Sequence, residues 1–371
     1  MTALIITFFT IYCSSLFLIL GIGFSLQRKK EKSYRIGTQI NCSDITLIVP
    51  LRNEEKRIEG LIQSLLAAKK TPSKVIFIDD HSTDSTVQVI NAKLHRIPFQ
   101  IIDLPNDIEG KKQAIRFGIN QSTSKFILCM DADVSFASDY FEQLETLSEA
   151  EMYLLPATLI AKRNVEHFFE IDLLLVNALN AGMSGLFRPV VASGANLFFK
   201  KETFLQVDKI ETHVHIPSGD DIYLLRDFRE AKCDVRLVSD IRNQVTTETP
   251  QSFSEFLHQR IRWISKTGHV KDNLSTFLAI FQLVLTLGFI GMLIFLFFKN
   301  QFQIAIAIFC LKTGVDMLLF FPFFKEFKRT AAWFLIPLYQ LIFPVYNLIL
   351  LVILPFFKPK WKGRYSGINH R

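Results

Sequence analysis

Residues 126–133 read FILCMDAD, and residues 75–84 read VIFIDDHSTD. In both stretches a run of mostly apolar residues ends in carboxylates. Such a run predicts a strand that is buried on both faces, as in a parallel sheet. Open parallel sheets bind ligands beyond the carboxyl ends of their strands. The acids at these two strand ends are therefore the first candidates for a functional site.

The same pattern continues on both sides of these stretches. Further strands are expected at ITLIVP (45–50) and FQIIDL (99–104), with amphipathic segments between the strands. One such segment is expected to begin a helix near Asn53, a good N-cap residue, and another helix is expected over residues 110–119. The alternation predicts an α/β domain with a Rossmann-like, mostly parallel sheet over residues 43–250.

Apolar segments flank this domain. Of the 371 residues, 49% are hydrophobic and 21% are charged, and the mean hydropathy is +0.26. Residues 3–26 are long enough to cross a bilayer core of about 30 Å. Because Arg28, Lys29 and Lys30 follow this segment instead of preceding it, we interpret residues 1–27 as an uncleaved anchor and not as a signal peptide. These cations are expected to hold the following domain in the cytosol.

Residues 273–357 contain three more apolar stretches, of which the first two are expected to cross the membrane. The third contains Pro337, Pro344 and Pro355, so it is expected to be kinked, interfacial or re-entrant and not a straight span. Residues 358–371 form a basic tail. If all three stretches crossed, this tail and the basic loop before the third stretch would lie on opposite sides of the membrane, and only one of these two basic segments could face the cytosol. The number of C-terminal crossings, two or three, therefore stays open.

Charge and cysteine content narrow the class of protein further. The net charge of +7 favours anionic partners, both lipid headgroups and phosphorylated substrates. The five cysteines are scattered without ligand-like spacing, which indicates a reduced compartment. Lys312 and Asp316, four residues apart in an apolar stretch, are expected to form an ion pair on the helix surface. His213 and His215 alternate, but the sequence offers too few further ligands for a zinc site.

Two acidic motifs carry the chemistry. Asp131 and Asp133 point the same way at a strand end, so both can approach one divalent cation. Asp220 and Asp221 directly precede the amphipathic stretch IYLLRDF and are expected at a helix N-terminus. A carboxylate there is suited to take a proton from a hydroxyl group within hydrogen-bond reach. In SGAN (193–196), the glycine is expected to permit a tight backbone turn.

A further motif, QRIRW, lies in FSEFLHQRIRWISKTGH (253–269). Its apolar residues recur at helical spacing among basic residues. The pattern predicts an amphipathic interfacial helix within residues 251–272 that binds anionic headgroups.

Together these motifs resemble those of the membrane-bound family 2 glycosyltransferases, which include cellulose, chitin and hyaluronan synthases and ceramide glucosyltransferase. The resemblance covers roughly residues 43–270, and the flanking apolar segments fit it. Its carriers, in order, are IVPLRNEE (48–55), IDDHSTD (78–84), GKKQAI (110–115), MDAD (130–133), SGAN (193–196), SGDD (218–221) and QRIRW (259–263).

The resemblance implies a GT-A fold that binds a nucleotide-diphosphate sugar. It implies that Asp133, aided by Asp131, holds Mg²⁺ or Mn²⁺ against the diphosphate, whose negative charge grows as the sugar leaves.

The resemblance also places the nucleotide. The acids Glu54 and Asp80 correspond to residues that contact the base or ribose, and Lys111 corresponds to a lysine near the nucleotide. Lys112 is the alternative for this last role, because the two lysines are adjacent.

The remaining roles concern the acceptor and the leaving group. Asp221 corresponds to the general base, with Asp220 as its neighbour. Arg262 corresponds to a residue that binds the diphosphate, and Trp263 to one that lines the acceptor site. Gln259 completes the QxxRW pattern.

The sequence therefore predicts an integral protein of the cell (inner) membrane, with its catalytic domain facing the cytosol. We expect an inverting glycosyltransferase, with this stereochemistry implied by the resemblance, that uses a lipid or other membrane-proximal glycan acceptor, contacts membrane lipids and binds no nucleic acid. The alternatives are a processive polysaccharide synthase subunit, a nucleotidyltransferase, and a non-enzymatic membrane scaffold with a degenerate domain. A secreted polymer needs a channel of several helices, which the few spans here make less favoured.

Overall fold

The fold is known from a computed structural model that describes residues 2–213, 219–267, 270, 272–356, 360–361 and 364–365. The chain divides into two compact units. We call the first the sheet unit; it comprises residues 30–160, 191–248 and 358–371. We call the second the helical unit; it comprises residues 1–29, 161–190 and 249–357.

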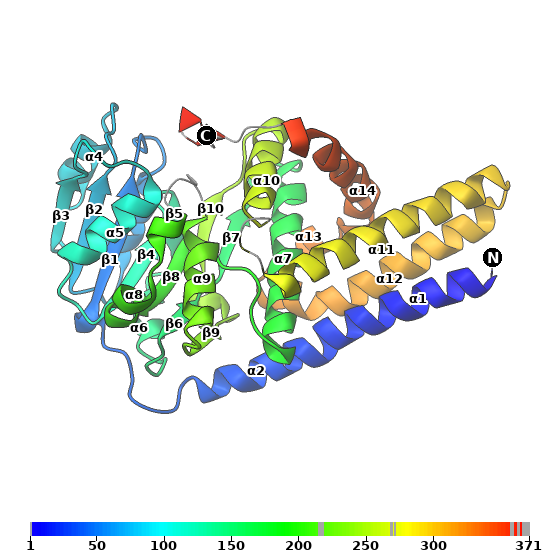
Figure 1. Ribbon diagram of the computed structural model, residues 1–371, viewed down its shortest axis with the longest axis horizontal. Coiled ribbons are helices and arrows are strands. Elements are labelled where there is room, and N and C mark those ends of the chain that lie inside the picture. The colour runs from blue at the N-terminus through cyan, green and yellow to red at the C-terminus, as the bar shows by residue number, and fades with distance from the viewer. Residues whose placement is uncertain are drawn as a thin grey trace. The chain divides into compact units, whose positions relative to one another are not determined.

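The sheet unit is built on a seven-stranded sheet with the order β3-β2-β1-β4-β8-β6-β9 (Figure 1). Its strands are β1 (Ile45–Leu51), β2 (Lys74–Asp79), β3 (Phe99–Asp103), β4 (Phe126–Met130), β6 (Met152–Leu154), β8 (Asn196–Lys200) and β9 (Val235–Leu237). β1 to β4 are parallel to one another, whereas β8 is antiparallel to β4 and β6. The predicted strands and the mostly parallel α/β class are confirmed.

Helices and a smaller sheet complete this unit. The helices are α3 (Glu59–Ala67), α4 (Thr86–Lys93), α5 (Lys111–Gln121), α6 (Tyr140–Leu144), α8 (Lys201–Val207) and α9 (Asp220–Glu230). A three-stranded sheet contains β5 (Val134–Phe136), β7 (Ala157–Ile160) and β10 (Val245–Glu248). α5 packs so closely on β1 and β2 that a Cβ atom on Gly118 would lie 2.9 Å from Ile48 and 3.0 Å from Ile78.

The strand register gathers several loops at one edge of the large sheet. Leu51, the last residue of β1, pairs with Asp79, the last residue of β2. Met130, the last residue of β4, pairs with Asn196, the first residue of the antiparallel β8. The loops that follow β1, β2 and β4 and the loop that precedes β8 therefore meet at the same edge.

The helical unit contains the apolar segments. Its elements are α1 (Thr2–Leu16), a π-helical stretch η1 (Phe17–Gly23), α2 (Phe24–Ser33, whose last turn passes into the sheet unit), α7 (Glu166–Leu186), α10 (Phe253–Thr267), α11 (Asn273–Phe298), α12 (Phe302–Glu326), α13 (Thr330–Trp333) and α14 (Ile336–Ile353). Within the described residues, four helices are long and apolar enough to cross a membrane: Ala3–Ser33, Asn273–Phe298, Phe302–Glu326 and Ile336–Ile353. The chain is a membrane protein. Figure 1 shows α1, α11 and α12 running alongside one another, and α12 contacts both of the others.

The third C-terminal stretch is interrupted, as its prolines suggested. α13 ends at Trp333, and α14 begins at Ile336 with Pro337 in its first turn. Pro344 lies inside α14, which nevertheless has the length and composition of a span. The predicted basic tail lies almost entirely outside the described residues.

The predicted ion pair between Lys312 and Asp316 is confirmed, with 2.8 Å between Nζ and Oδ2. The pair is shielded by the neighbouring helices, because Asp316 is only 5% exposed. Tyr12 of α1 and Gln340 of α14 also donate hydrogen bonds to Asp316. Lys312 in turn donates to Gln340 Oε1 over 2.9 Å. The pair thus joins three of the membrane-spanning helices.

Three buried carboxylates attach α7 to the rest of the helical unit. Glu166 lies 2.5 Å from Arg163 Nε, and Glu170 lies 2.7 Å from Arg329 Nε. Asp172 forms an ion pair with Arg260 of α10 and accepts a hydrogen bond of 2.8 Å from the Tyr339 hydroxyl of α14. Because a buried charge is costly unless it is paired, each of these contacts fixes a neighbouring segment against α7.

Candidate active site

The loops after β1 and β2 hold each other in place. Asn53 accepts a hydrogen bond of 2.8 Å from the Thr83 backbone N–H, and its own N–H donates to Ser82 Oγ over 3.0 Å. The predicted helix start near Asn53 is wrong: α3 begins at Glu59, and Asn53 adopts a left-handed backbone with φ of 52°. The contacts with the loop after β2 hold Asn53 in this conformation.

Asp80 directly follows β2 and is buried. Gly110, immediately before α5, donates its N–H to Asp80 Oδ2 over 3.0 Å. His81 Nδ1 lies 3.1 Å from Asp80 Oδ1, and Arg52 donates to the Asp80 backbone carbonyl over 2.7 Å. His81 has a left-handed backbone with φ of 57°, which is unusual for a residue with a side chain. Asp80 therefore links the end of β2 to the start of α5.

Arg57, which no sequence motif singled out, connects Glu54 to the loop after β4. Arg57 Nη2 lies 3.0 Å from Glu54 Oε2, and Arg57 Nη1 lies 3.8 Å from Asp133 Oδ2. Glu54 also donates its backbone N–H to Thr86 Oγ1 over 2.8 Å. Glu54 and Arg57 are three residues apart, a spacing that signals a local pair, but the sequence does not reveal the contact with Asp133.

Lys111 joins the two acidic motifs. Its Nζ lies 2.6 Å from Asp131 Oδ1 and 2.9 Å from Asp220 Oδ2. Burial lowers the pKa of Lys111, but the carboxylates of Asp131 and Asp220 outweigh it and raise the pKa well above the ordinary range. Lys111 therefore stays charged and holds the N-terminus of α9 against the end of β4.

The DAD carboxylates suit a hard divalent cation. Asp131 and Asp133 follow β4 directly, and their side chains are 34% and 29% exposed. Two partly exposed carboxylates leave room for water and phosphate oxygens, which Mg²⁺ and Mn²⁺ accept together with protein carboxylates. The donor set thus fits the metal that the sequence analysis expects here.

Asp221 and Gly194 meet at the same place. Asp221 Oδ2 accepts a hydrogen bond of 3.2 Å from the Gly194 N–H, and Oδ1 accepts one of 2.8 Å from the Ile222 N–H. A Cβ atom on Gly194 would lie 2.6 Å from Asp220 Oδ2 and 2.9 Å from Lys111 Nζ. The predicted tight turn is present, because the Asn196 N–H donates to the Ser193 carbonyl oxygen over 3.1 Å. Gly194 is not among the described glycines with positive φ, so its distinguishing feature is this close approach to Asp220 and Lys111.

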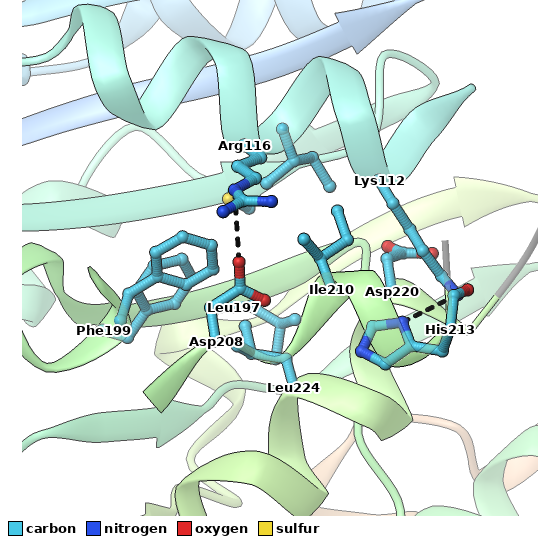
Figure 2. A pocket seen from close by; sticks show the side chains of 12 residues that line it. Lys112, Arg116, Leu197, Phe199, Asp208, Ile210, His213, Asp220 and Leu224 are labelled. Atoms are coloured by element: carbon cyan, nitrogen blue, oxygen red, sulfur yellow. Dashed lines mark hydrogen bonds and ion pairs between the residues drawn. The ribbon is translucent and has the colours of Figure 1, made fainter. Parts of the chain in front are cut away.

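Lys112 lines a small cavity of about 30 Å³, which Asp220 and His213 also line (Figure 2). Its Nζ lies 2.9 Å from the His213 carbonyl oxygen and 4.4 Å from the centre of the Tyr223 ring, on which His213 stacks. Lys112 therefore fixes α5 against α9. Of the two adjacent lysines, Lys111 is the one beside the acidic motifs.

Asp208 and His213 line this cavity, and their potential ligand atoms lie within 4.8 Å of one another and of those of Asp227. Arg116 Nε lies 3.5 Å from Asp208, and Arg226 Nη2 lies 2.7 Å from Asp227. These cations already balance the two carboxylates, so the cluster is a buried charge network and a poor cation site. His215, the other histidine of the pattern, lies outside the described residues.

The QRIRW motif lies on α10, in the helical unit. Gln259, Arg262 and Trp263 are partly exposed there. Arg260, to which the motif assigned no role, is the buried charged residue of the motif: it pairs with Asp172, and its guanidinium lies 4.3 Å from the centre of the Trp263 ring. One face of that ring is thus covered by a cation. The pairing of Arg260 with a distant helix has no local sequence signal.

The strand order and the acidic cluster at the carboxyl edge define a GT-A-like α/β domain. The mannosyltransferase PcManGT from Pyrobaculum calidifontis, solved in complex with GDP-Man and Mn²⁺, has this fold. It matches with a TM-score of 0.53 and 16% identity over 93% of this chain and 99% of that chain.

Residues 46–216 match the model of glycosyl transferase family 2. The chain therefore contains a family 2 glycosyltransferase domain. It is 28% identical over 135 residues to the poly-beta-1,6-N-acetyl-D-glucosamine synthase of Staphylococcus aureus (strain COL), over 36% of this chain and 32% of that protein. It is 30% identical over 146 residues to the 4,4'-diaponeurosporenoate glycosyltransferase of Staphylococcus aureus (strain bovine RF122 / ET3-1), over 38% of this chain and 39% of that protein. The chain thus spans about a third of the length of the first relative and about two fifths of the second.

Proposed function

We propose that the protein is a membrane-anchored glycosyltransferase that moves a sugar from a nucleotide-diphosphate sugar to a lipid or other membrane-proximal acceptor. The observation that carries this proposal is the position of Lys111 between Asp131 and Asp220. It brings a candidate site for a metal-bound diphosphate next to a helix that presents a candidate base. The membrane-crossing helices favour an acceptor that is itself at the membrane.

Each residue has a distinct part in the proposed reaction. Asp133 and Asp131 would hold Mg²⁺ or Mn²⁺, which when bound neutralises the diphosphate. Glu54 and Asp80 would bind the base or ribose, and Lys111 would lie near the phosphates. This assignment is supported by the common sheet edge on which their loops meet.

The proposed transfer is a direct, inverting displacement. The acceptor hydroxyl oxygen attacks the anomeric carbon, its proton passes to Asp221, and the electron pair of the broken C–O bond leaves with the nucleoside diphosphate. Asp221 is preferred to Asp220 because two backbone N–H groups orient it, whereas Lys111 neutralises Asp220. Arg262 would bind the leaving diphosphate, Trp263 would line the acceptor site, and Gln259 would support them.

We also propose that the protein lies in the cell (inner) membrane with its catalytic domain in the cytosol. Basic residues follow the first span and favour this orientation, and nucleotide sugars are made in the cytosol. A cysteine introduced at Ser85 should resist impermeant thiol reagents in intact cells. Labelling of that cysteine without permeabilisation would refute this orientation.

The function itself is tested with the purified full chain, a panel of nucleotide sugars and a membrane lipid extract. Release of nucleoside diphosphate that depends on lipid, on a divalent cation and on Asp221 is expected. Full turnover in EDTA would contradict the metal assignment, and no release with any donor would contradict the function.

A polysaccharide synthase is the second candidate, and the match to the poly-beta-1,6-N-acetyl-D-glucosamine synthase favours it. The two candidates differ in product length. A single added sugar, seen by mass spectrometry of the acceptor, supports the first, whereas a ladder of products supports the second.

A further inference from the structure

We propose that Arg57 is a resident counter-ion of the candidate metal site: it holds Asp133 while the divalent cation is absent, and it turns to the diphosphate oxygens when the cation takes Asp133 over. The inference rests on the proposed function and assigns an additional donor-binding residue to that site.

The contacts of Arg57 form a bridge between two acids. One terminal nitrogen lies 3.0 Å from Glu54 Oε2, and the other lies 3.8 Å from Asp133 Oδ2. The second carboxylate of the DAD motif, Asp131, has its own cation in Lys111, at 2.6 Å. Each of the two candidate metal ligands therefore faces a basic side chain from another element.

Charge on Asp133 is compensated in both states. Arg57 faces Asp133 while the divalent cation is absent, and the cation supplies positive charge there when Arg57 leaves; Lys111 stays beside Asp131 and Asp220 throughout. Without resident cations, two carboxylates separated by one residue would repel each other. The exchange also releases N–H donors beside the place where a diphosphate would bind, and a planar guanidinium matches phosphate oxygens with two parallel hydrogen bonds.

The side chain of Arg57 has the freedom that this exchange needs, while its backbone is fixed. The Arg57 N–H donates to the Glu54 carbonyl oxygen over 2.9 Å, and the next residue, Ile58, is fully buried. The guanidinium side chain, in contrast, is 38% exposed, and its contact with Asp133 is longer than a hydrogen bond. A partly exposed pair of this kind opens at little cost.

A purely structural Arg57, which pairs with Glu54 to stabilise the turn, makes a different prediction. Its removal would lower the affinity for every ligand of the site, or for none. A resident counter-ion instead has opposite effects on two ligands, since it competes with the free cation and attracts the diphosphate. The sign of the two effects therefore separates the two roles.

The experiment is isothermal titration calorimetry of the full chain in detergent micelles, with Mn²⁺ alone and then with inorganic pyrophosphate at saturating Mn²⁺. Arg57→Gln is expected to bind Mn²⁺ about fivefold more tightly than the wild type and to bind pyrophosphate at least about fivefold more weakly. A fivefold change corresponds to the upper end of the interaction energies of partly exposed ion pairs. The adjacent Lys56→Gln is the matched control, and it should change neither affinity.

Two outcomes would overturn the proposal: both affinities unchanged in Arg57→Gln, or both lowered. If Arg57→Gln does not fold, Arg57→Lys replaces it; this variant should keep the Mn²⁺ affinity and lose pyrophosphate affinity, and wild-type pyrophosphate binding would refute the role. Asp133→Ala tests the proposed function separately. Unchanged Mn²⁺ binding in Asp133→Ala would remove the metal site itself, and with it the premise of the inference.

Discussion

The backbone of Gly194 lies directly against the Asp220 carboxylate, so that an added Cβ atom would be 2.6 Å from Oδ2. The same glycine donates its N–H to Asp221. A single residue before β8 thus contacts both acids at the start of α9. These contacts fix the two acids relative to Lys111, whose Nζ would lie 2.9 Å from the same added Cβ atom.

Gly194→Ala is therefore expected to displace the pair of Asp220 and Lys111. Turnover should fall about 10- to 100-fold, because small misplacements of catalytic groups carry costs of this size. The melting temperature should fall only moderately, as expected for overpacking by one methyl group. Gly291→Ala, in α11, is the control, since an added Cβ there meets nothing within 4 Å. Wild-type turnover in Gly194→Ala would show that the close approach has no part in the reaction.

The two acids of α9 should differ on conversion to amides. Asp221→Asn is expected to keep donor binding and to lose about 10²- to 10⁴-fold in transfer rate, since the substitution keeps the shape and removes the base. Asp220→Asn should mainly weaken donor binding, because it removes a partner of Lys111. Calorimetry with the donor and a turnover assay measure both effects. If Asp220→Asn lost the transfer rate and Asp221→Asn kept it, the base would be Asp220.

The strands and their terminal acids were predictable because their signals are local. A buried apolar run such as residues 126–130 predicts a strand from its own composition. The acids that directly follow it are then placed at the end of that strand, at the sheet edge. The choice between Lys111 and Lys112 was not predictable, because adjacent helical residues point in different directions and only packing decides which of them pairs with the acids. Lys112 enters the cavity beside Tyr223, and Lys111 is left for the acids.

The errors have a common cause in contacts between distant segments. The helix start expected near Asn53 fails because hydrogen bonds with residues 82 and 83 hold that turn in another conformation. The roles of Arg57 and Arg260 were missed because each depends on an acid from another element, at Asp133 and Asp172. A propensity or a motif at one position carries no information about such a partner.

Arg262 and Trp263, adjacent on α10, are expected to fail in different ways. Arg262→Lys should lower turnover with any acceptor, since lysine keeps the charge and loses the two-pronged donor geometry. Trp263→Ala should impair transfer more than the slow hydrolysis of the donor by water. Transfer and hydrolysis are measured side by side in variants of normal melting temperature. Equal, wild-type activities in both variants would leave the motif as a membrane-binding element.

Glu166 at the start of α7 should make stability depend on acid pH. Burial raises its pKa, but the hydrogen bonds from the Lys162 backbone and the Arg163 side chain outweigh burial and lower the pKa to about 2, from an ordinary 4.5. Because the folded pKa is lowered, the stabilisation is present above about pH 4.5 and is lost as the pH falls toward 2. Glu166→Gln should therefore melt lower than the wild type at pH 7, and the difference should shrink between these two pH values. A constant difference would exclude the carboxylate as its origin.

The pair of Lys312 and Asp316 should stabilise the membrane part through three helices. Lys312→Met leaves Asp316 as a buried charge whose remaining partners, Tyr12 and Gln340, are neutral, and it is expected to destabilise the protein by about 3 kcal/mol, as for other broken buried pairs. The double variant Lys312→Met/Asp316→Leu removes both charges and should recover most of that loss, because a well-packed apolar pair replaces an ionic one at little cost. Melting temperatures in detergent, compared with those of Cys310→Ala at an exposed position of the same helix, measure both. If the double variant lost as much stability as Lys312→Met and the single variant Asp316→Leu lose in sum, the charges would not act as a pair.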